Sequence, residues 1–444
     1  MSSLDPVARW GEYATKNPKI QFVWLRFMSH KGTILTRIVP QARFASMLQT
    51  GKHISVPKAA FYLDPSDVLA EGGSPSGKMS LQPDLTTIRS QAGSNGTRAV
   101  VMCDCLEADG SPAALCPRSR LQGLTSKLDQ ELGFSALVGF EVEVIFLRPE
   151  TENGKTQYQP VNQTHCWSSM TVDDQDLLGL IEAIAHGLAE AGITLEHFHA
   201  EAAQGQWEFV LPPATPVEAV DMLIEARETI RSIAHAHGLH ATLHPRISPV
   251  QAGTGAHVHL SVEKTREGSR DPESFFAGII DHMPAILAFS LPQVDSYQRV
   301  ATGTWSGGEY ACWGWENKEA ALRRIEYAHF ELKLCDGFAN PYLVLSALLT
   351  AGMTGLHQCL LLQAGDCTKS SGDLTSEERE ALGIRVKLPK TLDESLAALE
   401  GDPIFQSSLG PAIMESYLAV KKAEARFFKA LDVDDRKSWL IARY

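Results

Sequence analysis

Residues 139–144 read Gly-Phe-Glu-Val-Glu-Val, and residues 256–261 read Ala-His-Val-His-Leu-Ser. Alternate residues of a β-strand point to opposite faces of the sheet. Each stretch therefore predicts a strand with one apolar face and one face that carries ionisable groups. Two further stretches, residues 206–210 and 330–334, repeat the pattern with glutamate. Glutamate is depleted in strands, so its recurrence there calls for an explanation.

Two explanations compete for these four strands. Amphipathic strands with solvated outer faces are the simpler one, and for any single strand it is the better one. Four such strands together favour a polar site on which they converge. Carboxylates in one cavity repel and shift one another's pKa values unless cations neutralise them. Oxygen-rich ligation with one imidazole suits Mg²⁺ or Mn²⁺ better than Zn²⁺, and such ions in enzymes usually bridge phosphates.

Composition bounds the class of protein. The chain has 444 residues, of which 44% are hydrophobic and 21% charged, as in globular proteins that bury a sizeable core. A formal net charge of −13 argues against a nucleic-acid partner. The eight cysteines contain no CxxC pair, which fits reduced thiols and predicts a cytoplasmic protein. No secretory signal is expected, because the first eleven residues contain no apolar run. No membrane partner is expected, because the apolar residues 341–362 fit a buried core helix better than a membrane span.

The pattern along the chain changes once. Residues 20–104 contain short apolar runs broken by turn residues, which predicts a small mixed sheet. Helical spacing of leucines begins after Pro117, and we predict two domains, residues 1–112 and 113–444. Helices are expected at residues 172–192, at 215–238 behind a capping box at Thr215, at 341–362 as a buried core helix, and at 416–431.

Five ordered strings carry a resemblance to a known family. They are residues 139–143, 201–208 (Glu-Ala-Ala-Gln-Gly-Gln-Trp-Glu), 253–261, 296–299 (Ser-Tyr-Gln-Arg) and 339–343 (Ala-Asn-Pro-Tyr-Leu). In order and spacing they resemble the glutamine synthetase family, over about residues 117–444. The resemblance implies an α+β fold: an N-terminal β-grasp domain and a catalytic domain with a curved antiparallel sheet flanked by helices. It also implies a ring-shaped homo-oligomer, a dodecamer by analogy, in which the neighbouring subunit completes the site.

The resemblance also implies which residues form the site. The first metal site would comprise Glu143, Glu201 and Glu208, and the second Glu141, His257 and Glu331, with Mg²⁺ or Mn²⁺ and ATP as cofactors. His259, Ser261, Arg323 and His329 would contact the nucleotide, Gly253, Arg299, Trp305 and Lys333 the substrates, and Arg299, Arg323, Lys318 and Lys333 would be catalytic.

Departures from the family pattern concern the nitrogen donor. Family members that use ammonia keep an Asp-Gly-Ser-Ser string, for which this chain has residues 57–61, and a flap glutamate, for which it has Trp305. The nearest carboxylate is Glu309. Loss of both acids should weaken ammonia use. Trp305, Tyr310, Trp313 and Trp315 would line a pocket for a larger amine, although packing explains any single one of them better.

Other departures concern the acid. Lys318, His329 and Lys333 occupy positions where arginine is usual, and Ala252 replaces an asparagine. Lysine keeps the charge but lacks the planar fork of arginine, so the acid is expected to be glutamate or a relative of it.

The leading hypothesis is an ATP-dependent carboxylate–amine ligase that activates its acid as an acyl phosphate and couples it to an organic amine. One alternative is an ordinary glutamine synthetase that uses ammonia, with Glu309 or another acid replacing the lost site. A second alternative is a catalytically silent structural or signalling oligomer. Such relatives lose metal ligands, whereas this chain keeps all six ligand types, so we rank it low.

Overall fold

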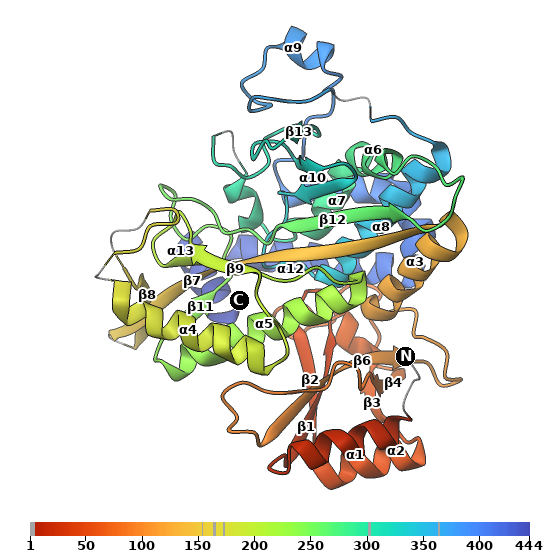
Figure 1. Ribbon diagram of the computed structural model, residues 1–444, viewed down its shortest axis with the longest axis vertical. Coiled ribbons are helices and arrows are strands. Elements are labelled where there is room, and N and C mark those ends of the chain that lie inside the picture. Colours follow the sequence, from red (N-terminus) through yellow and green to blue (C-terminus); the bar gives the residue numbers. More distant parts are fainter. Residues whose placement is uncertain (1–4, 153, 163–165, 172–173, 301–302, 363–364) are drawn as a thin grey trace.

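A computed structural model describes residues 5–152, 154–162, 166–171, 174–300, 303–362 and 365–444. It is a mixed α and β structure with two sheets, as predicted, and a smaller N-terminal part lies at one end of the molecule (Figure 1). The short helix α9 (Ser376–Ala381) lies at the opposite end.

The N-terminal sheet is small and mixed. Its strands are β1 (Phe22–Met28), β2 (Ile34–Pro40), β3 (Ile54–Pro57), β4 (Lys78–Pro83), β5 (Arg89–Ser90) and β6 (Arg98–Leu106). They lie in the order β2-β1-β6-β4-β3, with β5 beside β6, and only β1 and β6 pair in parallel. Helices α1 (Pro6–Lys16) and α2 (Gln41–Thr50) cover the sheet, and the rings of Trp10 and Phe44 meet edge-on with centroids 4.8 Å apart. The apolar runs at residues 20–104 therefore form the predicted sheet.

The larger sheet holds the four strands that the sequence singles out. Its strands are β7 (Phe134–Glu152), β8 (Lys155–Pro160), β9 (His197–Ala200), β10 (Gln206–Val210), β11 (His240–Thr242), β12 (Val258–Lys264), β13 (Trp313–Trp315), β14 (Leu322–Glu326) and β15 (His329–Leu332). Their order is β13-β14-β15-β12-β7-β10-β9, with β8 and β11 also paired to β7. All pairs are antiparallel except β13 with β14. The four strands are therefore consecutive in the sheet, in the order β15-β12-β7-β10.

Helices cover this sheet and supply most of the core. They are α3 (Pro117–Leu132), α4 (Gln175–Glu190), α5 (Pro216–Ala236), α6 (Glu273–Asp281), α7 (Met283–Ser290), α8 (Pro341–Gln358), α10 (Leu392–Gly401), α11 (Pro403–Leu409), α12 (Pro411–Ala430) and α13 (Val433–Arg443). Almost every residue of α8 is buried, as predicted for a core helix, and its N-terminus is capped by the Asn340 side chain. Within the described residues, no helix combines the length and apolarity that a bilayer span requires.

Two details of the helices differ from the sequence predictions. The Thr215 side chain does not cap α5; its hydroxyl donates instead to the Glu218 carboxylate at 2.6 Å, so the predicted capping box is wrong. Helix α4 begins at Gln175, and residues 172–173, part of the predicted helix, lie outside the described residues.

Separate hydrophobic clusters fill the two parts of the molecule, and buried charges join them. The Arg26 guanidinium on β1 is 1% exposed and lies 3.0 Å from the Glu225 carboxylate on α5. Arg118, in the first turn of α3, pairs with three carboxylates that lie on both sides of the junction. The predicted boundary at residue 112 stays a prediction, because these contacts show how the parts are joined and not where each one ends.

Candidate active site

The four glutamate- and histidine-bearing strands lie side by side, and their polar faces line one cavity. Glu208 on β10 lies opposite Glu143 on β7, and His259 on β12 lies opposite Glu331 on β15. The cavity has a volume of about 230 Å³. Its wall includes Glu141, Glu143, Glu201, Glu208, Gly253, His257, Arg299, Trp305, Lys318, Arg323, Glu331 and Lys333. These side chains therefore line one cavity, and their roles in a site stay predictions.

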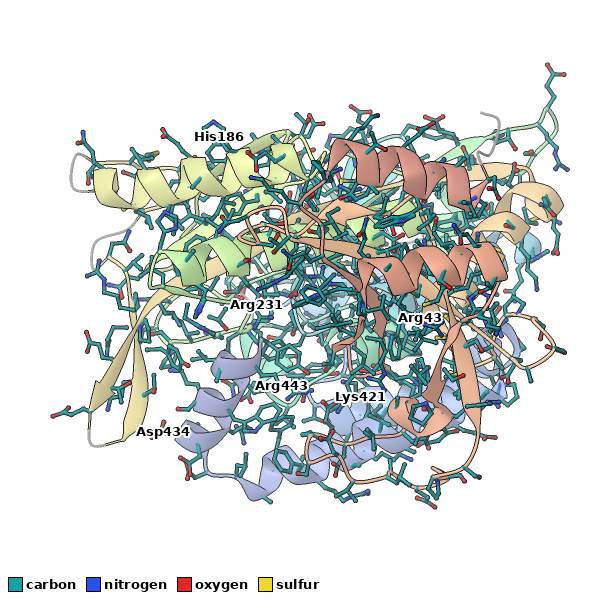
Figure 2. All side chains as sticks on the ribbon, turned by 90° about the horizontal axis from the view of Figure 1, so that it is seen from below. Arg43, His186, Arg231, Lys421, Asp434 and Arg443 are labelled. Atoms are coloured by element: carbon teal, nitrogen blue, oxygen red, sulfur yellow. The ribbon has the colours of Figure 1, made fainter. Side chains whose placement is uncertain are left out.

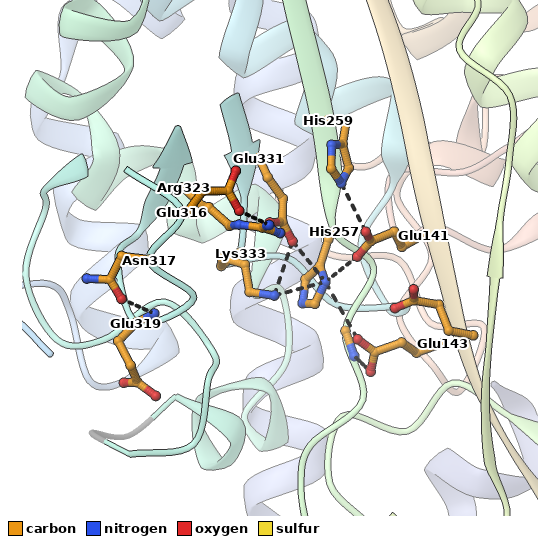
Figure 3. A network of polar contacts seen from close by, with 12 residues as sticks. Glu141, Glu143, His257, His259, Glu316, Asn317, Glu319, Arg323, Glu331 and Lys333 are labelled. Carbon is orange, nitrogen blue, oxygen red and sulfur yellow. Dashed lines mark hydrogen bonds and ion pairs between the residues drawn. The ribbon is translucent and has the colours of Figure 1, made fainter. Parts of the chain in front are cut away.

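His257 is the centre of the polar network (Figure 3). Its Nδ1 lies 2.8 Å from the Glu141 carboxylate, 3.3 Å from that of Glu331 and 3.6 Å from that of Glu143. The His257 side chain is only 6% exposed. Three carboxylates thus lie within about 4 Å of one imidazole nitrogen. An isolated structural histidine does not need this arrangement.

Backbone and amide donors hold two of the glutamates. Gln206 Nε2 and the Gly255 backbone N–H each donate to Glu143 Oε2 at 2.7 Å. The Trp167 indole N–H donates to Glu201 Oε1 at 3.0 Å, and the Ala202 N–H donates to Glu201 Oε2 at 2.9 Å. These bonds fix the orientation of both carboxylates, as supporting residues do in metal sites.

The carboxylates carry more negative charge than the protein itself neutralises. Burial, and then the charges of Glu141, Glu143 and Glu201, raise the pKa of Glu208 to about 10. A carboxyl group in this position is ionised at neutral pH only when a cation is bound nearby. Among the groups of residues whose ligand atoms lie within 4.8 Å of one another, two contain Glu141: Glu141, Glu208 and His257, and Glu141, His259 and Glu331. The residues present therefore fit divalent metal ions, although these groups do not divide the ligands as the family pattern does.

Cationic side chains lie beside the carboxylates. Lys333 Nζ is 3.1 Å from Glu331 Oε1 and 3.3 Å from His257 Nδ1. Arg323 Nη1 donates to the other oxygen of Glu331 at 3.1 Å. Arg299 is 3% exposed and donates through Nη1 to the Lys333 carbonyl. Three cations around one end of the cavity suit an anionic substrate or a transferring phosphoryl group.

Two tryptophans and a lysine form the rim of the cavity. Lys318 Nζ lies 5.3 Å from the ring centroid of Trp167 and 5.9 Å from that of Trp305, within cation–π range of both. The two indoles are 52% and 59% exposed. Sequence reasoning predicted Trp305 and Lys318 but missed Trp167, which precedes a polar segment without periodicity.

Several predicted residues lie outside this wall. His259 Nε2 is 3.0 Å from Glu141 and His259 Nδ1 is 3.2 Å from His329 Nε2, farther along the same sheet face. Ser261 pairs with His329 in the strand register. These three residues lie next to one another as a nucleotide site would require, and their role stays a prediction.

Three of the four proposed pocket aromatics pack elsewhere. The Tyr310 ring lies under Arg379, with 4.6 Å between ring centroid and guanidinium carbon. Trp313 and Trp315 flank the guanidinium of Arg324. Only Trp305 of the four belongs to the cavity wall, so the packing explanation holds for the others.

The family model described as "Glutamine synthetase, catalytic domain" matches residues 114–437. The chain belongs to the glutamine synthetase family. Glutamine synthetases are ATP-dependent ligases that form amide bonds, so this chain carries the catalytic domain of such a ligase.

Relatives of several kinds resemble this family member. Protein fluG of Emericella nidulans is 42% identical over the whole chain, which spans about half (51%) of that protein. The gamma-glutamylpolyamine synthetase of Streptomyces coelicolor is 31% identical over 93% of the chain and 91% of its own length. A glutamine synthetase of Methanocaldococcus jannaschii is 28% identical over 98% and 96%.

Solved structures share the fold. A structure described as a GmaS/ADP complex superposes with a TM-score of 0.81 over 98% of this chain and 100% of that one, at 23% identity. A structure described as a novel glutamine synthase homolog gives a TM-score of 0.79 over 96% and 99%, at 25% identity. The mixed architecture with a curved catalytic sheet is therefore that of glutamine synthetases.

Proposed function

We propose that the protein joins a carboxylic acid, glutamate or a close relative, to an organic amine at the expense of ATP. The observation that carries this proposal is the rim of the cavity, where Trp167, Lys318 and Trp305 lie together. The Trp305 indole stands there in place of the flap glutamate of ammonia-using family members. Two exposed indoles offer flat apolar faces to an aliphatic, aromatic or cationic amine. The relative named gamma-glutamylpolyamine synthetase supports an amine acceptor.

Use of ammonia would need a carboxylate that binds ammonium and takes its proton. Glu309, the nearest candidate by sequence, lies 2.9 Å from Lys390 Nζ and is not part of the cavity wall. Glu319 is closer to the rim, but its oxygens accept the backbone N–H groups of Gly303 and Trp305. Both carboxylates already have partners, which favours an organic amine over ammonia as the nitrogen donor.

The cationic end of the cavity suits the activation of the acid. Arg299 and Lys333 are placed to bind and orient the carboxylate that attacks the γ-phosphoryl group of ATP. Arg323 stabilises the charge that develops on the phosphoryl oxygens. The amine then displaces phosphate from the resulting acyl phosphate, and the amide remains.

The carboxylate cluster is the proposed position of the divalent metals. Glu141, Glu143, Glu201, Glu208, His257 and Glu331 would hold them. Bound Mg²⁺ or Mn²⁺ supplies the positive charge that draws the phosphates of ATP toward the cluster. His259 and His329 would contact the nucleotide on the adjoining sheet face.

A ring-shaped homo-oligomer is part of the proposal. Ile38, on the edge strand β2, is 55% exposed, and Phe22 on the adjacent β1 is 41% exposed. Exposed apolar side chains on a sheet edge are suited to contact another subunit. Mass photometry of the purified protein tests this, since a monomeric population at micromolar concentration would contradict it.

Phosphate release tests the reaction. The wild-type protein is supplied with ATP, Mg²⁺ or Mn²⁺ and glutamate, with ammonium in one arm and polyamines, ethanolamine and aromatic amines in the other. We expect kcat/KM for the best amine to exceed that for ammonium by about tenfold or more, a difference of about 1.4 kcal/mol in transition-state binding. Brisk turnover with ammonium, or none in either arm, would contradict the proposal.

A matched pair of variants tests the role of the rim. Trp305→Glu restores a carboxylate where ammonia users have one, so we expect its preference to shift from amine toward ammonium. Trp315→Glu is the control, because Trp315 is similarly exposed, at 49%, but lies outside the cavity wall. An equal shift in both variants would show that the rim does not determine the preference for amine over ammonium.

A further inference from the structure

The two segments that carry the proposed acid-binding residues lie against each other. Arg299 is the last residue of the short 3₁₀ helix η3 (Asp295–Arg299), and Gly253 lies in the loop between β11 and β12. A Cβ atom added to Gly253 would come within 2.8 Å of the Arg299 Cβ, so the two segments are in close contact. Both residues belong to the cavity wall. The position of each segment therefore constrains the other.

The Arg299 guanidinium is held by few bonds among the residues that the structure describes. Its Nη1 donates to the Lys333 carbonyl at 3.1 Å, and its Nη2 lies 3.4 Å from His257 Nε2. Its Nε is buried and has no hydrogen-bond partner in the described part of the chain. The position of this guanidinium therefore depends on the backbone of η3.

Helix α13 holds both segments through two consecutive residues. Arg436 Nε donates to Asp295 Oδ2 at 2.8 Å and Arg436 Nη2 donates to Asp295 Oδ1 at 3.1 Å. The two side chains are 11% and 5% exposed. Lys437 Nζ donates to the Ile247 carbonyl, in the loop that carries Gly253. Bidentate charge-assisted bonds fix orientation as well as distance, so the Arg436 pair orients the start of η3.

Helix α13 is itself fixed to the catalytic part of the molecule. Arg231 Nη2 on α5 donates to the Arg443 carbonyl of α13 at 3.0 Å, and both arginines are labelled in Figure 2. His240 Nε2 on β11 lies 2.6 Å from the Ile441 carbonyl. The Ile441 side chain is buried. The helix is therefore a fixed support for the two segments.

We propose that Arg436 is a positioning residue for the acid substrate, which acts through Asp295 on Arg299. The proposal rests on the proposed function, because it takes Arg299 as a contact of the acid. A displacement of about 1 Å at a substrate-orienting group can cost up to about a hundredfold in rate. The Tyr297 hydroxyl, which donates to the Ser395 hydroxyl at 2.6 Å, also anchors η3. Loss of Arg436 should therefore shift Arg299 without detaching its segment.

Steady-state phosphate release measures the effect on each substrate. The wild-type protein and Arg436→Met are supplied with ATP, Mg²⁺, glutamate and the best amine. We expect the KM for glutamate to rise by about tenfold in Arg436→Met, while the KM values for ATP and for the amine stay within about twofold. Arg436→Lys keeps the charge but not the planar fork, so its KM for glutamate should lie between the two.

The matched control is Arg443→Met. It removes the same charge from an exposed position on the same helix (Figure 2), and it should keep the wild-type KM for glutamate. Equal changes of all three KM values in Arg436→Met would indicate a general structural role and overturn the proposal. The same increase in Arg443→Met would overturn it as well.

A double variant tests whether Arg436 acts through Asp295. If it does, Asp295→Asn and Arg436→Met should raise the KM for glutamate to similar extents. The double variant should then be no worse than the more severe single variant, whereas independent effects would multiply. Multiplied effects would overturn the path through Asp295.

Hydrogen exchange of the same proteins gives a readout that does not need turnover. Residues 295–299 should exchange faster in Arg436→Met than in the wild type or in Arg443→Met. Unchanged exchange there, or an active Arg436→Met with the wild-type KM for glutamate, would overturn this inference alone. Absence of turnover in the wild type would contradict the proposed function and this inference with it, so the two failures are distinguishable.

Discussion

Trp305 combines two features that folding alone does not favour. Its side chain is 59% exposed, and its backbone has a φ of 55°, in the left-handed region that only glycine enters without strain. The Glu319 carboxylate holds this turn by accepting the backbone N–H groups of Gly303 and Trp305. Strain maintained by a dedicated partner is characteristic of functional positions.

Replacing Trp305 with glycine separates packing from function. Glycine relieves the left-handed strain but increases the entropy of the unfolded chain, so the free energy of unfolding should change by less than about 1 kcal/mol. The KM for the amine should rise by about tenfold, because the rim loses one indole face. Urea denaturation and amine-dependent phosphate release measure the two effects. A destabilisation of about 3 kcal/mol or more would indicate a packing role instead.

The alternation of polar and apolar residues predicted most of the residues in the cavity but not those at its edge. It assigned Glu141, Glu143 and His257 to one cavity because each stands in a run that is apolar at every other position. The same two-residue spacing marks His197 and His199, but their strand is only four residues long. No sequence signal marked Trp167, whose place beside Glu201 depends on the tertiary fold.

Helix α3 is the element that ties the N-terminal sheet to the catalytic part. Arg118, in its first turn, lies 2.6 Å from Asp84, 2.7 Å from Asp104 and 2.8 Å from Asp221. Asp84 and Asp104 belong to the N-terminal part and Asp221 to α5. The Arg118 side chain is 5% exposed and that of Asp221 is 6% exposed, so this pair is shielded from solvent, whereas Asp84 and Asp104 are partly exposed.

Removing the Arg118 charge should weaken this junction strongly. Arg118→Met keeps the aliphatic stem but leaves three carboxylates without their cation, and breaking a buried pair costs about 3–5 kcal/mol. Thermal unfolding should show a clear fall in Tm. Lys422→Met is the control: Lys422 pairs with Glu400 while 44% exposed, so its loss should cost about 1 kcal/mol or less. Equal effects would mean that the junction does not depend on Arg118.

The sequence predicted secondary structure well where a segment is apolar throughout or along one face, and less well where polar side chains compete for local hydrogen bonds. Helix α8 was predictable because it is apolar throughout and begins at Asn340-Pro341. The Thr215 cap was not, because the Thr215 hydroxyl donates to the Glu218 carboxylate and makes no capping hydrogen bond to the backbone of the helix. The tryptophans of β13 were also ambiguous, since a planar ring suits a substrate and an arginine equally.

At the scale of the whole molecule, the two parts also meet at a buried imidazole. His30 is 1% exposed at the turn between β1 and β2. Its Nε2 donates to the Leu115 carbonyl at 2.9 Å, and its Nδ1 lies 2.9 Å from the Ser416 hydroxyl on α12. Burial, more than any other cause, lowers the pKa of His30 to about 4 from 6.5. The folded protein thus keeps this ring neutral.

This imidazole should make the junction sensitive to acid. Above pH 6.5 the ring is neutral in both states and has no effect on pH dependence. Between pH 6.5 and 4 the unfolded chain binds a proton that the folded one does not, so stability falls as pH falls. At pH 5 the loss should be about 2 kcal/mol. Burial lowers the pKa of His244 in the same direction, so the wild-type slope contains more than one histidine.

The His30→Gln variant isolates the contribution of this one ring. Glutamine keeps a hydrogen-bonding side chain but does not titrate, so the variant should lose less stability than the wild type on acidification. Urea denaturation at pH 7.5 and pH 5 should show the difference between the two proteins changing by about 2 kcal/mol. Because both proteins keep His244, its contribution cancels in that difference. Parallel losses in the two proteins would show that His30 is protonated in the folded state, and that the junction tolerates the charge.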